Sequence, residues 1–176
     1  MKINFSLLIV SVCLTTNLLA QSEDYEKNSL GLGFGLDFGG IGTSFTTYPT
    51  QKLGLFAGLG YALADIGING GVKYRFVSDQ SYTRIAPYLI AMYGYNTAVV
   101  VSNYTAYNKM FYGPSLGVGV DFLKSPDKKG YWSLAIILPI RGSDVDDYLN
   151  DLRTTKNVVI SSPSPVAFSV GYRFKL

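Results

Sequence analysis

The sequence predicts an all-β protein: a closed, antiparallel, up-and-down transmembrane β-barrel of eight strands, preceded by a signal peptide. Apolar residues alternate with small or polar ones through eight segments after residue 28, and the last segment runs to the final residue. Charged residues make up only 15% of the chain, whereas a soluble domain carries about 25%. After residue 20, no segment is long and apolar enough to be a spanning helix.

The first twenty residues form the predicted signal peptide. A positive start at Lys2, an apolar stretch and a small residue at Ala20 are typical of a secretory signal cleaved before Gln21. The alternative is an uncleaved anchor, although the apolar stretch is short against the roughly 20 residues that a span needs. The only cysteine, Cys13, lies in this segment, so the exported chain would form no disulfide. The predicted organisation is a signal peptide at 1–20, a polar lead at 21–28 and a barrel domain at 29–176.

The first four predicted strands each have an apolar face, and glycine repeats on the opposite face of the first, third and fourth, as it does in the sixth. Their ranges are 29–38, 41–48, 52–63 and 66–77. The apolar faces, in the same order, are Leu30, Leu32, Phe34, Leu36 and Phe38; Ile41 and Phe45 with Thr43 and Thr47; Leu53, Leu55, Ala57, Leu59 and Tyr61; and Ile66, Ile68, Val72, Tyr74 and Phe76. Glycine weakens an ordinary strand, so its repetition on one face indicates the inside of a narrow barrel, where side chains crowd.

The last four predicted strands cover 83–96, 109–123, 130–141 and 165–176. The fifth is ambiguous, because two sets of residues compete for its apolar face: Ile85, Leu89, Ala91, Tyr93 and Tyr95 against Tyr88, Ile90 and Met92. The others alternate clearly, through Tyr112, Leu116, Val118, Val120 and Phe122; Trp132, Leu134, Ile136, Leu138 and Ile140; and Val166, Phe168, Val170, Tyr172, Phe174 and Leu176. Most strands reach the 9–11 residues that a tilted strand needs to cross hydrocarbon.

The connections alternate between short turns and longer loops. Short turns follow the second, fourth and sixth strands, whereas the loops at 97–108 and 142–164 are long. This asymmetry is expected of a barrel with short periplasmic turns and long external loops. Aromatic residues are also expected to form a belt at each rim, one from Tyr48, Tyr74, Phe76, Phe122, Tyr131, Trp132, Tyr172 and Phe174, the other from Phe38, Tyr61, Tyr93, Tyr95, Phe111 and Tyr112.

The signal peptide, the eight alternating strands and the glycine- and aromatic-rich repeats resemble the small outer-membrane β-barrel proteins of OmpA/OmpX type, over residues 29–176. The terminal Tyr172, Phe174 and Leu176 are similar to the C-terminal assembly signal of that family, which usually ends on an aromatic residue. The resemblance implies an integral protein of the cell outer membrane, with membrane lipid and the barrel-assembly machinery as its partners.

The composition disfavours several classes of function. The chain has no histidine, which excludes Ser-His-Asp hydrolysis and His-ligated metals. Its net charge is +3 and no block of basic residues occurs, so no nucleic-acid partner is expected. We therefore predict no enzyme activity, no cofactor and no metal centre. A weaker alternative is a divalent cation held by the aspartates of the last long loop, Asp144, Asp146, Asp147 and Asp151.

Within that same loop, Val145, Leu149 and Leu152 lie at helical spacing. This spacing predicts a short helix that covers the barrel mouth, with Ser143 as its N-cap.

The sharpest set of candidate site residues is a group of charges on the predicted lumen face. Its members are Asp37, Lys73, Arg75, Asp121, Arg141 and Arg173, with Lys175 on the same face. Buried charges need partners, and an eight-stranded barrel has room for little more than its own side chains. We therefore expect an internal network of ion pairs and hydrogen bonds; the alternative is an ion path.

The leading functional hypothesis is a non-enzymatic outer-membrane barrel with a structural or surface-interaction role. An extracellular protein or glycan would be recognised through the loops at 97–108 and 142–164. Two alternatives stay open: a narrow porin-like channel for ions or small solutes, and a soluble exported binding barrel of lipocalin type.

Overall fold

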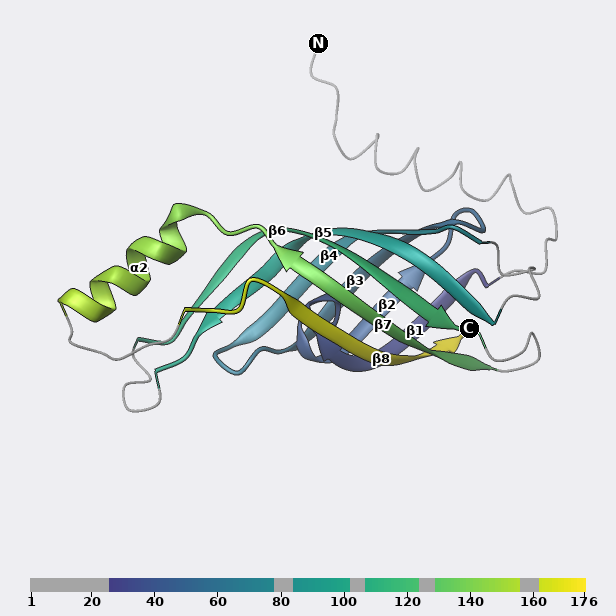
Figure 1. Ribbon diagram of the computed structural model, residues 1–176. Coiled ribbons are helices and arrows are strands. Elements are labelled where there is room, and N and C mark those ends of the chain that lie inside the picture. The colour runs from purple at the N-terminus through teal and green to yellow at the C-terminus, as the bar shows by residue number, and fades with distance from the viewer. Residues whose placement is uncertain (1–25, 78–83, 102–106, 124–128, 156–161) are drawn as a thin grey trace, which may run out of the picture.

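In the computed structural model, the described residues are 26–77, 84–101, 107–123, 129–155 and 162–176, and they form one antiparallel sheet closed into a barrel (Figure 1). Strand order follows the chain, and the eighth strand pairs with the first to close the barrel. The predicted fold class is confirmed, while the predicted signal peptide lies outside the described residues.

All eight predicted strands are present, with bounds shifted by a few residues. They are β1 (Asn28–Gly35), β2 (Gly40–Thr47), β3 (Leu53–Tyr61), β4 (Ile66–Arg75), β5 (Ile85–Val99), β6 (Lys109–Phe122), β7 (Gly130–Pro139) and β8 (Ala167–Lys175). A 3-10 turn, η2 (Leu36–Phe38), follows β1, and a helix, α2 (Ser143–Thr154), follows β7. No helix in the described ranges is long and apolar enough to cross a membrane.

The barrel has two ends with different connections. At one end, here the turn end, β1 begins, β8 ends, and short connections follow β2, β4 and β6. At the other, here the mouth end, residues 100–108 follow β5 and residues 140–166 follow β7. The predicted asymmetry holds for the connection after β7, whereas the one after β5 is no longer than residues 76–84 after β4, because β5 continues to Val99.

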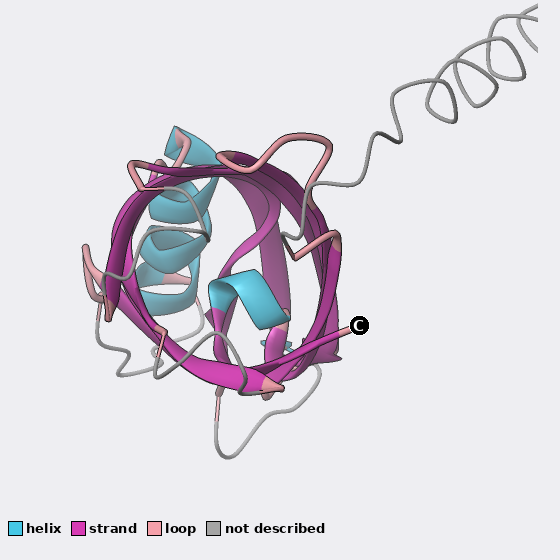
Figure 2. Ribbon diagram, turned by 90° about the vertical axis from the view of Figure 1, so that its right-hand side faces the viewer, coloured by secondary structure: helices cyan, strands magenta, loops and turns pink. Residues whose placement is uncertain are grey.

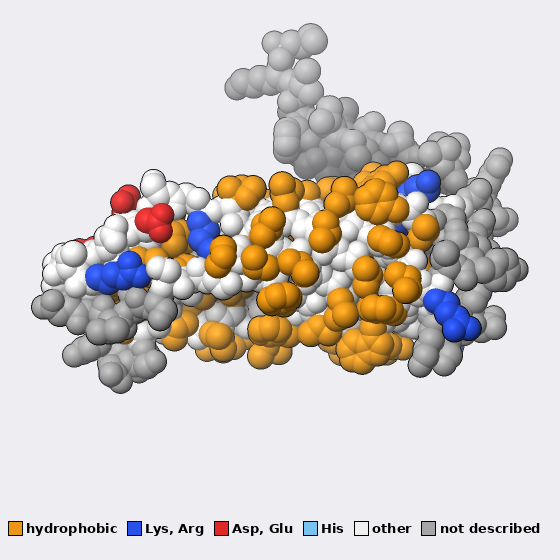
Figure 3. Space-filling view, in the orientation of Figure 1, with side chains coloured by type: hydrophobic (Ala, Val, Ile, Leu, Met, Phe, Trp, Pro, Cys, Tyr) orange, Lys and Arg blue, Asp and Glu red, His pale blue; other side chains and the backbone are white. Residues whose placement is uncertain are grey.

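The outer wall is apolar throughout its length. Along β1, for example, Leu32 and Phe34 are 52% and 54% exposed, whereas the alternate residues Ser29 and Gly31 are buried. The same alternation holds on the other strands, and apolar side chains cover the visible wall between the two ends (Figure 3). Period-two alternation thus separates an apolar outside from a mixed interior.

The first strand corrects the sequence prediction. It ends at Gly35 instead of residue 38, and η2 then turns into the lumen, where Figure 2 shows it inside the ring of strands. Leu36 and Phe38, which were expected to face outward, are therefore buried inside. The backbone can make this inward turn because Gly35 and Gly39 flank it, at φ 142° and 71°, values that favour glycine.

The fifth and sixth strands form a hairpin that projects past the barrel at the mouth end (Figure 1). The ambiguity of the fifth strand is resolved: Tyr88, Ile90 and Met92 face the lumen. A register shift between Tyr95 and Thr97 marks where the projecting part begins.

The predicted helix is present as α2, and it packs against the projecting hairpin. Its buried residues Val145, Leu149 and Leu152 form a cluster with hairpin residues Val99, Val101 and Phe111. The predicted N-cap is wrong, because Gly142 holds that position and Ser143 is the first helical residue. The cap is made without any side-chain hydrogen bond.

Candidate functional site

The lumen holds the main concentration of charged chemistry, and Arg75 at the end of β4 is its hub. The Arg75 guanidinium donates from Nε to Asp121 at 2.9 Å, from Nη1 to Glu26 at 3.0 Å and from Nη2 to the Tyr131 hydroxyl at 2.5 Å. Lys73, two residues earlier on the same face of β4, donates to Asp121 at 2.8 Å. Asp121 on β6 therefore pairs with both cations of β4.

Aromatic rings complete the surroundings of these two cations. The Arg75 guanidinium lies 4.3 Å from the centre of the Tyr48 ring, and Lys73 Nζ lies 3.7 Å from the centre of the Tyr88 ring. The Tyr131 hydroxyl donates to Glu26 at 2.8 Å. Desolvated cations over aromatic faces are stabilised by the ring quadrupole, so neither cation relies on its carboxylate partners alone.

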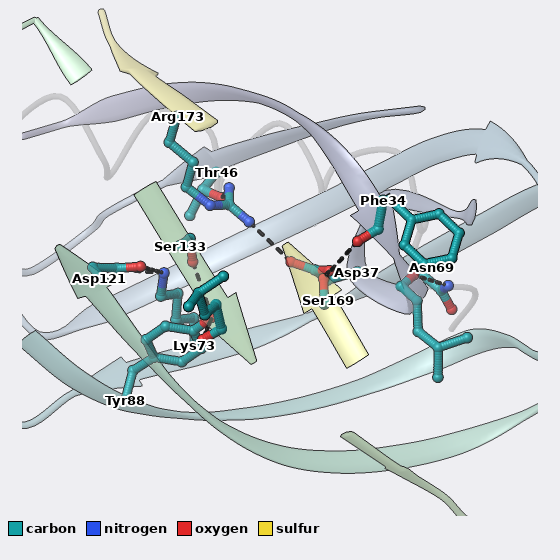
Figure 4. A network of polar contacts seen from close by, with 12 residues as sticks. Phe34, Asp37, Thr46, Asn69, Lys73, Tyr88, Asp121, Ser133, Ser169 and Arg173 are labelled. Atoms are coloured by element: carbon teal, nitrogen blue, oxygen red, sulfur yellow. Dashed lines mark hydrogen bonds and ion pairs between the residues drawn. The ribbon is translucent and has the colours of Figure 1, made fainter. Parts of the chain in front are cut away.

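A second group of polar contacts anchors the internal turn (Figure 4). Arg173 on β8 donates to Asp37 of η2 at 3.2 Å and to the Thr46 hydroxyl at 2.8 Å. Asp37 also accepts a hydrogen bond from Ser169. On the opposite side, the Asn69 amide donates to the Leu36 carbonyl. The turn is thus tied to β8 through its carboxylate and to β4 through its backbone.

The glycines of the inner wall make room for this turn. A Cβ at Gly31, Gly33 or Gly171 would lie 2.9, 2.7 or 2.3 Å from the Phe38 ring. A Cβ at Gly58 would lie 2.3 Å from the Asp37 carbonyl oxygen. The glycine-rich face therefore packs directly against η2. The sequence indicates crowding inside the barrel, and η2 is the element that causes it here.

Apolar side chains fill a further part of the described lumen. Leu36 of η2 packs with residues from β3, β5 and β7, and all members of this cluster are at most 6% exposed. They are Phe56, Tyr88, Ile90, Met92, Ala135 and Ile137.

The structure brings together five of the six predicted lumen charges: Asp37, Lys73, Arg75, Asp121 and Arg173 are buried and paired. Arg141 lies apart at the mouth end, beyond β7. There it donates to the Thr97 hydroxyl and to the Ser164 carbonyl, each at 2.6 Å.

The sequence reasoning missed Glu26, which it placed in a polar lead. Glu26 lies before β1, so strand alternation gives no information about its side chain. The charge count offers a signal, however: the three buried cations, Lys73, Arg75 and Arg173, face only two predicted carboxylates in Asp37 and Asp121. Charge neutrality calls for a third carboxylate.

The aromatic belts are correct in part. Tyr48, Tyr131 and Phe38 lie in the lumen and Phe111 lies in the cluster with α2, so these four belong to neither belt. Tyr48 and Tyr131 face inward because they occupy the lumen positions of the strand alternation, next to outward neighbours. The belt at the turn end keeps Tyr74, Phe76, Phe122, Trp132, Tyr172 and Phe174 on the outer wall.

The three residues of the predicted assembly signal lie on the outer side of β8 or just past its end. The Tyr172 ring lies edge-on between those of Trp132 and Phe174, at centroid distances of 5.4 and 5.0 Å. Leu176 is 70% exposed.

The acidic loop residues do not assemble into a metal site in the structure. Among the described residues, no group of three or more His, Cys, Asp or Glu side chains is placed to hold a metal ion.

No protein-family model and no curated protein matches the sequence. Among solved structures, the N-terminal β-barrel domain of Pseudomonas aeruginosa OprF matches with a TM-score of 0.50 and 12% identity, over 86% of this chain and 98% of that domain. This chain has the fold of an outer-membrane β-barrel. A transmembrane β-barrel designed de novo matches with a TM-score of 0.44 and 13% identity, over 89% of this chain and all of the design.

Proposed function

We propose that this chain is an integral, non-enzymatic protein of the outer membrane, with a structural or surface-interaction role. The observation that carries the proposal is the inverted distribution of residues: large apolar side chains cover the outer wall, while ion pairs lie in the lumen. A soluble barrel needs a polar outside, and exposed apolar patches of soluble proteins rarely exceed a few hundred Å². A lipid bilayer is the solvent that suits this wall.

The filled lumen favours a structural role over a channel. Three cations and three carboxylates are buried there: Lys73, Arg75 and Arg173 with Glu26, Asp37 and Asp121. Each cation is paired within 3.2 Å of a carboxylate oxygen. Moving an ion past them would require breaking buried pairs, which are held in place by their low-dielectric surroundings. The η2 turn and the apolar cluster also lie in the described interior.

The mouth end carries the proposed interaction surface. There the β5–β6 hairpin and α2 form one packed unit that stands beyond the barrel wall (Figure 1). The packing gives the loops at 97–108 and 142–164 a firm support, and such loops on a rigid scaffold are common recognition sites. An extracellular protein or glycan is the proposed partner, and the barrel-assembly machinery is the proposed partner during insertion.

The proposal is tested by fractionation, gel mobility and conductance. The protein should sediment with outer membranes, require detergent for extraction, and migrate differently on gels before and after boiling. In planar bilayers it should give no reproducible single-channel steps. Recovery in the soluble fraction after osmotic shock would overturn the membrane assignment, and steady conductance would overturn the closed lumen.

A further inference from the structure

The turn end carries a regular ring of positive charge. Each of the four strands that begin there is directly preceded by a basic residue: Lys27 before β1, Lys52 before β3, Arg84 before β5 and Lys129 before β7. All four side chains are exposed. The strands that begin at the mouth end are preceded by Gly39, Asp65, Asn108 and Val166. We call the four basic residues the cationic ring.

Strand pairing fixes the depth of the ring relative to the aromatic belt. The Lys52 carbonyl accepts from the Arg75 amide at 2.8 Å, and the next pair in the ladder joins Leu53 to Tyr74 of the belt. In the same way, the Lys129 carbonyl accepts from the Lys175 amide at 2.9 Å, and the next pair joins Gly130 to Phe174. Lys52 and Lys129 therefore lie one residue beyond belt residues of the neighbouring strands. Aromatic belts mark the membrane–water interface, so the ring lies at headgroup depth.

The charge of the ring is not neutralised nearby in the described structure. None of its four cations forms an ion pair with a described carboxylate, and the lumen network below it is internally balanced. The described mouth end has the opposite excess, with Asp65, Asp144, Asp146, Asp147 and Asp151 against Lys109, Arg141 and Arg153. The described parts of the two ends thus differ in the sign of their charge.

We propose that the cationic ring binds the phosphate groups of anionic phospholipids in the leaflet at the turn end. The proposal rests on the membrane location proposed above. Lys and Arg side chains are long enough to place their charge at headgroup level while their stems cover apolar wall. The ring recurs on every second strand around the barrel, which suits a shell of many lipids better than one discrete ligand. The neighbouring belt supplies the surface for acyl chains.

The single tryptophan of the chain is a built-in reporter of this shell. Trp132 is 55% exposed on the outer wall, three residues after Lys129 in the chain. The protein is refolded into phosphatidylcholine vesicles that contain either a phosphatidylglycerol or a phosphatidylcholine with a quencher on the upper acyl chain. Trp132 quenching should be stronger with the anionic quencher. At low salt, each nearby cation should favour the anionic lipid over phosphatidylcholine beside Trp132 by up to about five-fold, and added salt should reduce this preference.

Two matched substitutions test whether the preference for anionic lipid arises at the turn end. Lys129→Gln should reduce the preference for the anionic quencher, whereas Lys109→Gln, an exposed cation at the mouth end, should leave it unchanged. Replacing chloride with inorganic phosphate at equal ionic strength should also leave it unchanged. Equal quenching by the two lipids, an equal effect of both substitutions, or competition by free phosphate would each overturn the proposal.

The same measurement separates this proposal from the membrane assignment. If both lipids quench Trp132 equally, the barrel is in the membrane but the ring does not select anionic lipid. If neither lipid quenches Trp132, the wall is not in contact with lipid and the proposed membrane location fails first.

Discussion

Removal of the Glu26 carboxylate is the most direct test of the lumen network. The Glu26 Oε2 and Arg75 Nη1 atoms are 3.0 Å apart, and both side chains are buried. Two unit charges at this distance attract by about 5 kcal/mol at an effective dielectric constant of about 20, and the cost of desolvating them offsets part of this attraction. Glu26→Ala also deprives the Tyr131 hydroxyl of its acceptor. It leaves three buried cations with two carboxylates, and we expect a loss of about 3–5 kcal/mol in the free energy of unfolding.

The assay is urea unfolding in detergent micelles or lipid vesicles, followed by gel mobility and Trp132 fluorescence. Asp147→Ala, which removes a carboxylate from the exposed face of α2, is the matched control and should change the free energy by less than about 0.5 kcal/mol.

A double substitution distinguishes charge imbalance from lost packing. Glu26→Ala with Arg75→Met removes one charge of each sign and restores neutrality in the lumen. Replacing a buried pair by apolar groups is often neutral, so the double variant should be more stable than Glu26→Ala alone, even though it also loses the contacts of Arg75 with Asp121 and Tyr48. A loss of under about 1 kcal/mol for Glu26→Ala, or additive losses in the double variant, would refute the reasoning.

Three further outcomes are expected. Gly171→Ala should destabilise the barrel by about 1–3 kcal/mol in urea titrations, because its Cβ would lie 2.3 Å from the Phe38 ring. Adding Phe38→Ala should relieve that loss. Gly70→Ala is the control, because its Cβ would meet nothing nearer than 3.6 Å. Leu149→Ala should cost about 2–4 kcal/mol of local stability and hasten protease cleavage at the mouth end, with the barrel's gel mobility unchanged. Asn150→Ala, at an exposed position of α2, should change neither the local stability nor the cleavage rate. Because Phe38 plugs the lumen, Phe38→Ala should raise ion leakage from vesicles above that of the parent, whereas unchanged leakage would show that the other lumen residues suffice to close it.

The sequence predicts the barrel well because lipid contact imposes a strict two-residue period on every strand. It fails at the end of β1, where Leu36 and Phe38 continue the same alternation although the chain has already turned inward. The only local indication is the pair Gly39 and Gly40, both at positive φ.

The candidate site shows the same limit. Lys73, Arg75, Asp121 and Arg173 reach the lumen by strand alternation, so their face is predictable. Asp37 reaches it through the 3-10 turn. The pairing of Asp37 with Arg173 depends on that turn, and the alternation of residues along the strands does not predict it.

The buried ion pairs contribute to the register of the strands as well as to their stability. A slip of one residue exchanges the two faces of a strand. On β1 it would bring Leu32 and Phe34 inward, where the Phe38 ring leaves no room even for a Cβ at Gly31 or Gly33. On β4 and β8 the same slip would turn Lys73 and Arg173 outward at the depth of the belt residues Tyr74 and Tyr172, where a cation that faces lipid costs up to about 1 kcal/mol. It would also leave Asp121 and Asp37 without partners in the lumen. The ion pairs of β4 and β8 therefore oppose a slip of these strands, and pairing along the closed sheet transmits their register to β1 through β8 and to β3 through β4. In this barrel, the inward glycines leave space for the internal turn and exclude larger side chains, and the buried ion pairs favour the same register.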